Sequence, residues 1–367
     1  MLRSVGLAAV ALAATTAGVA LGDHDGPRPL RADARWTTVF TPPAGVGIEG
    51  LTADRRGDLY TPGRGVVPCP VFRVRGGASA VVGNLPGPCN PAGLTFGPDG
   101  RLYVADSGRI MVLRPDPAAP PTATVFATGV PGSNGVVFDR RGDLWVSDGG
   151  TGQGRVWRIG RDGVPAEVFR VQPLANDVVA GGVGRDVRGL PPGTITITES
   201  GRQAANTLGS QHLVANGLAF DGDGRLYVAD TARGAIWRVH VDRRGRVLSR
   251  TGCDTTFAPN TLCLDAILVQ HPYLEGADGI VLDDDENIFV AANERNAIAV
   301  VTDEGRAVEY FRNPAPADTR LRNAGPLEFP TSPVLVGRRM CLTHSDTARR
   351  DNFPNAAGEG AKVSCVG

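Results

Sequence analysis

A short motif recurs along this chain of 367 residues: a leading residue, usually polar, followed by glycine and an aliphatic residue. The first copies lie about 42 residues apart, and self-similarity at such a period is typical of repeat architectures. A turn glycine follows most copies at a constant offset, as Gly57 follows Glu49, but in the fifth copy Glu286 takes that place. The copies are Glu49-Gly50-Leu51, Ala92-Gly93-Leu94, Asn134-Gly135-Val136, Asn216-Gly217-Leu218 and Asp278-Gly279-Ile280, with a degenerate copy at Ser332-Pro333-Val334.

Each repeat has the pattern of several short strands. An apolar run follows the motif, and then comes an apex such as Pro98-Asp99-Gly100, whose residues accept the positive φ of tight hairpin turns. A second strand begins with an aliphatic and an aromatic residue, as at Leu102-Tyr103, and further short strands follow. Helical periodicity is absent. Four short antiparallel strands per repeat are typical of a propeller blade, so the sequence predicts an all-β protein with a β-propeller fold.

One long gap between copies of the motif bears on the number of blades. Six copies of the motif predict a six-bladed propeller, but the gap between Asn134 and Asn216 is about twice the usual period, which leaves a seven-bladed alternative open. A candidate extra blade begins at Asn176 and includes Thr194–Thr198, but it lacks the turn glycine and the aliphatic–aromatic pair. We therefore interpret residues 171–213 as an insertion. The strand predicted over Trp36–Phe40 is expected to pair with the last blade and close the ring.

The N-terminus is typical of a secretory signal. Arg3 precedes an apolar stretch, and small residues continue to Gly22. We predict a signal peptide over 1–22, a flexible segment over 23–34 and a single propeller domain over 35–367. The apolar stretch is short for a membrane span, so none is expected after signal removal. The expected product is a secreted monomer.

The six cysteines fit an oxidising compartment, where they would form disulfides. Their number alone does not give the connectivity, but the propeller register favours three pairs that share a loop face, one loop or adjacent strands. A metal site built from cysteine is disfavoured, because the chain has no C-x-x-C motif and no Cys/His cluster. The expected pairs are Cys69–Cys89, Cys253–Cys263 and Cys341–Cys365.

The leading residues of the motif form the candidate site. The first strand of every blade lines the central channel and runs in the same direction, so Glu49, Asn134, Asn216 and Asp278 would ring one mouth of the channel. Two carboxylates and two amide carbonyls are hard oxygen donors that suit Ca²⁺, which takes ~6–8 oxygen ligands. The lack of His and Cys argues against zinc or copper. A single Asn-Gly or Asp-Gly is explained by loop geometry, but four oxygen acceptors in one slot favour a metal site.

The order of these leading residues resembles the senescence marker protein/gluconolactonase family, whose relatives include the paraoxonases and diisopropylfluorophosphatase. The resemblance implies a six-bladed propeller that holds Ca²⁺ through the Glu, the two Asn and the Asp, and that hydrolyses lactones or phosphotriesters. It also implies that Asp278 is the catalytic carboxylate. The insertion over 171–213 departs from the family pattern. The stretches that carry the resemblance most clearly are Val214–Phe220, Gly276–Ile280 and Phe329–Pro333.

The implied chemistry assigns roles to the ion and to Asp278. Ca²⁺ would act as a Lewis acid on the carbonyl of a small-molecule lactone or ester, and Asp278 would orient or deprotonate the attacking water. His271, seven residues before Asp278, is the best candidate for a proton shuttle, and His212 and His344 are expected on the same face.

Other functions have weaker support. A formal net charge of zero gives no reason to expect a nucleic-acid partner. No G-x-S-x-G elbow is present, so a serine hydrolase is disfavoured. Asp106, Asp148 and Asp230, which end second strands, are interpreted as acceptors for turn N–H groups. The rivals are a non-enzymatic propeller that binds a protein or glycan through its loops, and a synthase- or lyase-type propeller without a metal.

Overall fold

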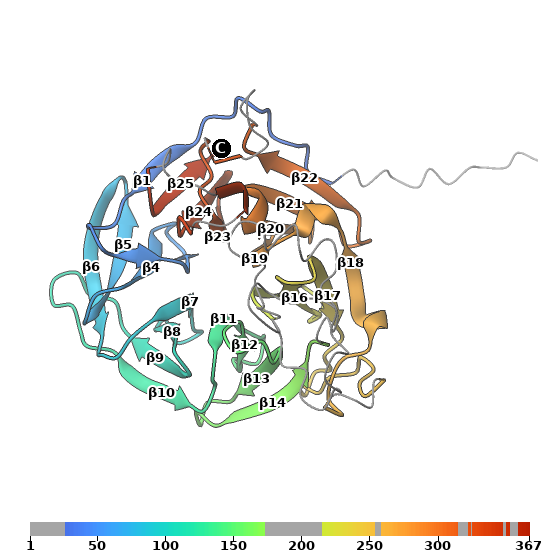
Figure 1. The fold of residues 1–367 in the computed structure, drawn as a ribbon. Helices are drawn as coiled ribbons and strands as arrows, with labels where there is room; N and C mark the ends of the chain where they lie inside the picture. Colours follow the sequence, from blue (N-terminus) through green and yellow to red (C-terminus); the bar gives the residue numbers. More distant parts are fainter. Residues whose placement is uncertain are drawn as a thin grey trace, which may run out of the picture.

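Six antiparallel sheets surround a central axis in the computed structural model of the chain (Figure 1). The structure describes residues 26–172, 215–253, 258–314, 322–323, 325–347, 350–352 and 359–367. Over these residues the six-bladed propeller expected from the repeats is confirmed. The candidate extra blade at 176–198 and His212 lie outside the described residues.

The strands follow one another from the axis outwards in every blade. Blade 1 holds β2 (Gly47–Ile48), β3 (Thr52–Ala53), β4 (Leu59–Arg64), β5 (Cys69–Arg75) and β6 (Ala78–Leu85), and blade 2 holds β7 (Pro91–Phe96), β8 (Leu102–Asp106), β9 (Arg109–Leu113) and β10 (Thr124–Thr128). Blade 3 holds β11 (Ser133–Phe138), β12 (Leu144–Asp148), β13 (Arg155–Ile159) and β14 (Pro165–Arg170), and blade 4 holds β15 (Leu218–Phe220), β16 (Leu226–Asp230), β17 (Ala235–Val239) and β18 (Ile267–Gln270). Blade 5 holds β19 (Ala277–Leu282), β20 (Ile288–Ala292), β21 (Ala297–Val301) and β22 (Ala307–Arg312), and blade 6 holds β23 (Pro330–Val336), β24 (Arg339–His344), β25 (Lys362–Val366) and β1 (Thr37–Phe40). Short 3₁₀ helices are η1 (Leu264–Ala266), η2 (Pro272–Leu274), η3 (Asn293–Arg295) and η4 (Arg350–Asn352).

The two ends of the chain meet in blade 6. Strand β1 is its outer strand and pairs with β25, with Thr37 opposite Cys365 (Figure 1). Ahead of β1, the Leu30 N–H donates to the Tyr310 carbonyl at 2.8 Å, which holds this segment against blade 5. No helix among the described residues has the length and apolar character needed to cross a membrane.

The disulfides follow the expected connectivity. Cys69 pairs with Cys89, Cys253 with Cys263 and Cys341 with Cys365. The last pair joins directly opposed residues of β24 and β25. It therefore fixes the blade in which the ring closes.

The motif glycine is required because neighbouring inner strands approach closely at the axis. A Cβ added to Gly135 would lie 2.3 Å from the carbonyl oxygen of Asn216, and one added to Gly217 would lie 2.5 Å from that of Asp278. Any side chain here would overlap backbone that has no room to move. The glycine of the motif is thus explained by packing between blades, whereas the identity of the leading residue is not.

The turns between first and second strands also share one conformation. Gly224 has a φ of 88°, and Glu286 keeps the same left-handed region with a φ of 64°. A non-glycine residue there costs about 1–2 kcal/mol. The Glu286 carboxylate accepts from the Gly222 N–H at 3.0 Å and pairs with Arg225 at 2.9 Å, which offsets part of that cost.

The aromatic residue of the second strand forms the contact between blades. The Tyr103 ring packs edge-on against Phe138 of blade 3, and Trp145 packs against Phe220 of blade 4 in the same way. Both Tyr103 and Trp145 are buried. The repeated aliphatic–aromatic pair therefore supplies the hydrophobic core between adjacent sheets.

Candidate functional site

A cavity of about 80 Å³ lies at the axis, and residues of the repeated motif from all six blades line it. Three of the four predicted ligands, Asn134, Asn216 and Asp278, are among the lining residues. Glu49 does not line the cavity, but its charge acts on Asp278, as described below. We call Glu49, Asn134, Asn216 and Asp278 the ring residues.

The register corrects one position of the ring. The sequence placed Ser332 as the leading residue of the last copy. In blade 6, however, Pro330 pairs with His344, whereas in blade 5 the pair in the same register is Ala277 with Ala292. The residue equivalent to Asp278 is therefore Thr331, whose hydroxyl donates to the Glu49 carbonyl at 2.7 Å.

Asp278 is the second residue of β19 and is 5% exposed. Its Oδ2 accepts from the Asn293 amide nitrogen at 2.8 Å. Burial raises the pKa of Asp278 well above its usual range and the nearby Glu49 carboxylate raises it further, while the Asn293 and Asn216 amides and Arg64 act in the opposite direction. Burial and the Glu49 charge thus both disfavour a negative charge on Asp278, and a cation bound nearby would favour its ionised form.

Asn216 is oriented by a threonine of the same blade. Its Nδ2 donates to the Thr231 hydroxyl at 3.1 Å, and that hydroxyl donates to the Ala277 carbonyl at 2.7 Å. Because the hydroxyl proton is used on Ala277, Thr231 accepts from Asn216. The amide nitrogen of Asn216 therefore faces Thr231, and its oxygen points away from Thr231.

Asn134 is positioned by the absence of a side chain beside it. It lies in β11 and is half-buried. A Cβ added to Gly149 would lie 2.4 Å from the Asn134 amide nitrogen. The glycine after β12 therefore leaves the space that the Asn134 side chain occupies.

Glu49 is bound by a residue that sequence reasoning missed. Its carboxylate forms an ion pair with Arg64, the last residue of β4, and the two side chains are 16% and 28% exposed. The recurring register of the blades is the signal that would have found Arg64, because equivalent residues contact the other ring residues.

This recurring contact defines what we call the support position. In blades 1, 3 and 5 the residue before the ring residue pairs with a residue at the end of the second strand, as Ile48 pairs with Gly63 and Ala277 with Ala292. The support position is the residue that follows this second-strand residue in the chain, and it contacts the ring residue of its own blade. The support residues are Arg64 for Glu49, Gly149 for Asn134, Thr231 for Asn216 and Asn293 for Asp278.

The donor set fits a hard divalent cation. The two carboxylates and two amides are oxygen donors of the kind that Ca²⁺ prefers, and a cation nearby would offset the effect of the Glu49 charge on Asp278. Within the part of the chain that the structure describes, no group of three or more His, Cys, Asp or Glu side chains is placed to hold a metal ion. A site here would therefore depend on the asparagine amides.

The aspartates that end the second strands of blades 2 to 4 accept loop N–H groups as expected, and each also binds an arginine. Asp106 accepts from the Asn90 N–H at 2.7 Å, Asp148 from the Thr151 N–H at 2.9 Å and Asp230 from the Arg233 N–H at 3.0 Å. The three carboxylates have no exposed surface. The ion pairs, which we call the clasps, are Asp106–Arg109 at 2.7 Å, Asp148–Arg155 at 2.9 Å and Asp230–Arg233 at 3.3 Å.

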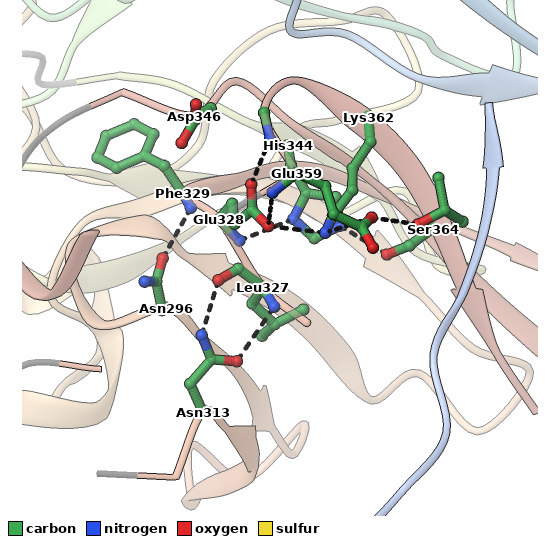
Figure 2. A network of polar contacts seen from close by, with 12 residues as sticks. Asn296, Asn313, Leu327, Glu328, Phe329, His344, Asp346, Glu359, Lys362 and Ser364 are labelled. Atoms are coloured by element: carbon green, nitrogen blue, oxygen red, sulfur yellow. Dashed lines mark hydrogen bonds and ion pairs between the residues drawn. The ribbon is translucent and has the colours of Figure 1, made fainter. Parts of the chain in front are cut away.

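His344 is part of a buried network rather than the axial cavity (Figure 2). Its Nδ1 accepts from the Glu328 N–H at 3.1 Å, and its Nε2 lies 2.7 Å from the Ser364 hydroxyl. Burial, together with the charge of Lys362, lowers the pKa of His344 to about 3, so the ring stays neutral. Lys362, the single lysine of the chain, pairs with Glu328 at 2.8 Å. A fully buried neutral histidine is unsuited to exchange protons with solvent.

His271 is held at the start of η2 by Tyr273. Its Nδ1 accepts from the Tyr273 N–H at 3.1 Å, and the two rings lie 4.4 Å apart. His271 does not line the axial cavity. These contacts therefore give no support to His271 as the expected proton shuttle.

Residues 176–326 match the family model described as the SMP-30/Gluconolactonase/LRE-like region. This stretch includes Asn216 and Asp278, so the resemblance expected from the motifs is confirmed. No curated protein sequence matches the chain.

Several solved structures share the fold. Regucalcin from Agrobacterium tumefaciens C58, described as a calcium-binding protein, is 17% identical, with 91% of this chain and 94% of that chain covered and a TM-score of 0.59. The PQQ-bound aldose sugar dehydrogenase of Streptomyces coelicolor is 15% identical, with 92% and 99% covered and a TM-score of 0.57. A luciferin-regenerating enzyme is 14% identical, with 93% and 94% covered and a TM-score of 0.55. Since these proteins differ in chemistry, the likeness shows the fold alone.

Proposed function

We propose that this chain is a calcium-dependent hydrolase of lactones or related esters, with the ion held by Glu49, Asn134, Asn216 and Asp278. The observation that carries the proposal is the buried Asp278 carboxylate, which lies beside Asn216 in the stretch that matches the SMP-30/gluconolactonase family and interacts with a second carboxylate, Glu49. The description of regucalcin as a calcium-binding protein supports the choice of ion.

The side chains of the ring would divide the work. When bound, Ca²⁺ supplies Lewis-acid polarisation of the substrate carbonyl. Asp278 positions the attacking water, and the hydrogen bond from Asn293 to its Oδ2 holds the carboxylate in place. Thr231 holds the Asn216 amide in one orientation, so that its oxygen is available to a cation.

We also propose that the protein acts outside the cytoplasm as a monomeric propeller domain over 35–367. The apolar leader over 1–22 and the three disulfides support this location. Disulfides persist in oxidising compartments and are rare where thiols are kept reduced.

Metal analysis combined with an activity panel tests the function. We expect the purified protein to carry about one Ca²⁺ per chain. We expect it to hydrolyse at least one lactone, aryl ester or phosphotriester, and to lose this activity in a chelator. Stoichiometric zinc, or no divalent ion in the folded protein, would contradict the site. A Ca²⁺-loaded protein that hydrolyses none of these substrates would instead be a binding module.

Two variants separate binding of the ion from the chemical step. Asn216→Ala removes a neutral ligand, so high added Ca²⁺ is expected to restore part of the activity by mass action. Asp278→Asn keeps an oxygen donor but removes the carboxylate, so Ca²⁺ is not expected to restore turnover. Near-normal turnover of Asp278→Asn at saturating Ca²⁺ would show that Asp278 is only a ligand.

A further inference from the structure

Arg64 differs from the other support residues because it carries a charge. Thr231 and Asn293 are neutral, and Gly149 has no side chain. A cation at the ring would compete with the positively charged Arg64 for the Glu49 carboxylate. The neutral support residues would offer a cation no such competition. Blade 1 therefore places a second cationic group beside the proposed ion site.

We propose that Arg64 is a substrate-recognition residue that binds a carboxylate on the lactone or ester, and that an ion at the ring releases it from Glu49 for this role. The inference rests on the proposed function, since it concerns the substrate of the same site. Arginine suits the role because its planar guanidinium binds a carboxylate through two parallel hydrogen bonds.

The charges of the site support an anionic substrate. Without an ion, Arg64 balances the charge of Glu49, and burial disfavours the charged form of Asp278. With a divalent ion bound, the two carboxylates balance the ion and the Arg64 guanidinium has no counter-charge among them. An unpaired charge in a partly buried place is unfavourable, so an anionic group on the substrate would be stabilised there.

The other arginines near the ends of second strands are already engaged. Arg109, Arg155 and Arg233 each bind an aspartate that has no exposed surface. Arg64 instead ends β4 with 28% of its side chain exposed, and the carboxylate it binds is a ring residue. Among these four arginines, Arg64 is the one whose partner is a proposed metal ligand.

The path of the Arg64 side chain is built into blade 1. Gly47 of β2 pairs with Arg64, and a Cβ added to Gly47 would lie 3.5 Å from the Arg64 Cγ and 3.6 Å from its Nε. The stem of Arg64 therefore lies over the bare backbone of Gly47. This arrangement directs the guanidinium towards Glu49, two residues further along the chain.

Cation binding without substrate tests the release of Arg64. Terbium or calcium would be titrated into the metal-stripped wild type, Arg64→Gln and, as a matched control, Arg250→Gln, which alters an exposed arginine paired with Asp265. Removing the internal competitor is expected to tighten cation binding about tenfold in Arg64→Gln, with no change in the control. Equal affinity in wild type and Arg64→Gln would overturn the competition.

Binding of an inert substrate analogue tests recognition. Calorimetry would compare a lactam that carries a carboxylate with the matching neutral lactam, with and without Ca²⁺. The wild type is expected to prefer the carboxylated lactam about tenfold when Ca²⁺ is present, and Arg64→Gln is expected to lose the preference. Arg64→Lys, which keeps the charge, is expected to retain part of it.

The outcomes distinguish this inference from the proposed function. A preference that is absent in the Ca²⁺-loaded wild type, or that persists in Arg64→Gln, would overturn the role of Arg64. Because lactams are not turned over, this result does not depend on catalysis. A wild type that prefers the carboxylated lactam but hydrolyses no lactone would contradict the proposed function and leave the assignment of Arg64 standing.

Discussion

Blades 1 and 5 each bring a carboxylate to the ring, but they support it with opposite chemistry. Asp278 accepts from the neutral Asn293, which has no exposed surface, whereas Glu49 pairs with the charged and partly exposed Arg64. A neutral donor fixes the position of a carboxylate and leaves its charge uncancelled. An arginine fixes its position and also cancels its charge. Under the proposed function, the Asp278 carboxylate would keep its charge for the ion, whereas the partner of Glu49 would be exchangeable.

The clasps of blades 2 to 4 give the reference for this comparison. There a buried aspartate and its arginine satisfy each other within one blade, as Asp230 and Arg233 do at 3.3 Å. The Glu49 carboxylate is also paired within its blade, with Arg64, but its charge in addition acts on Asp278 of blade 5.

The largest effect is expected when a clasp is broken. Asp230→Ala would leave Arg233, whose side chain is 7% exposed, without its carboxylate, and losing one partner of a buried pair costs about 3–5 kcal/mol. Urea denaturation of the purified variant would measure the loss in the free energy of unfolding. Asp265→Ala, in a pair whose side chains are 73% and 51% exposed, is the control and should change stability by less than about 1 kcal/mol. Equal losses of unfolding free energy in the two variants would show that a buried clasp stabilises the fold no more than an exposed ion pair does.

Features set by local periodicity could be predicted from the sequence. The six blades, the closure by β1 and the three disulfides all follow once the motif and its register are recognised. The convergence of Asn134, Asn216 and Asp278 on one cavity follows from the same register.

Features set by contacts between strands could not be predicted. The motif glycine has the sequence of a loop signal, but it is required by the approach of the next blade's backbone, as at Gly217. The last copy was placed one residue late because Pro333 obscures the motif, and the pairing of β23 with β24 that makes Thr331 equivalent to Asp278 is visible only in the structure. Arg64 escaped notice although each support residue follows its ring residue by 15 positions, because arginine, glycine, threonine and asparagine share no chemical type that marks the position.

A second prediction compares the two supports directly. Asn293→Ala removes a donor from the buried Asp278 carboxylate, and leaving such a group short of a hydrogen bond costs about 1–3 kcal/mol. Arg64→Gln, in a partly exposed pair, should cost less than about 1 kcal/mol in the metal-free protein. Urea denaturation of both variants in chelator would measure the two losses. A larger loss for Arg64→Gln than for Asn293→Ala would reverse the comparison and make Arg64 a structural residue.

Blade 6 extends the comparison, because His344 ends its second strand where blades 2 to 4 carry an aspartate. The pKa of His344 is lowered to about 3, so the folded protein keeps the ring neutral while the unfolded chain takes up a proton near its ordinary pKa of 6.5. The stabilising contribution of neutral His344 is therefore complete above pH 6.5 and is lost as the pH falls from 6.5 towards 3. The slope from one such group approaches about 1.4 kcal/mol per pH unit.

The measurement is the free energy of unfolding in urea between pH 7 and pH 5, a window chosen because most carboxylates titrate below it. His344→Gln is expected to flatten the decline in stability towards pH 5, while its stability at pH 7 falls through the altered contacts to Glu328 and Ser364. His240→Gln, at an exposed position, is the matched control and should leave the slope unchanged. Parallel slopes for wild type and His344→Gln would mean that His344 becomes protonated in the folded protein despite the neighbouring Lys362. Blade 6 would then hold two buried cations, the protonated His344 and Lys362. In the clasps, by contrast, every arginine has its own carboxylate.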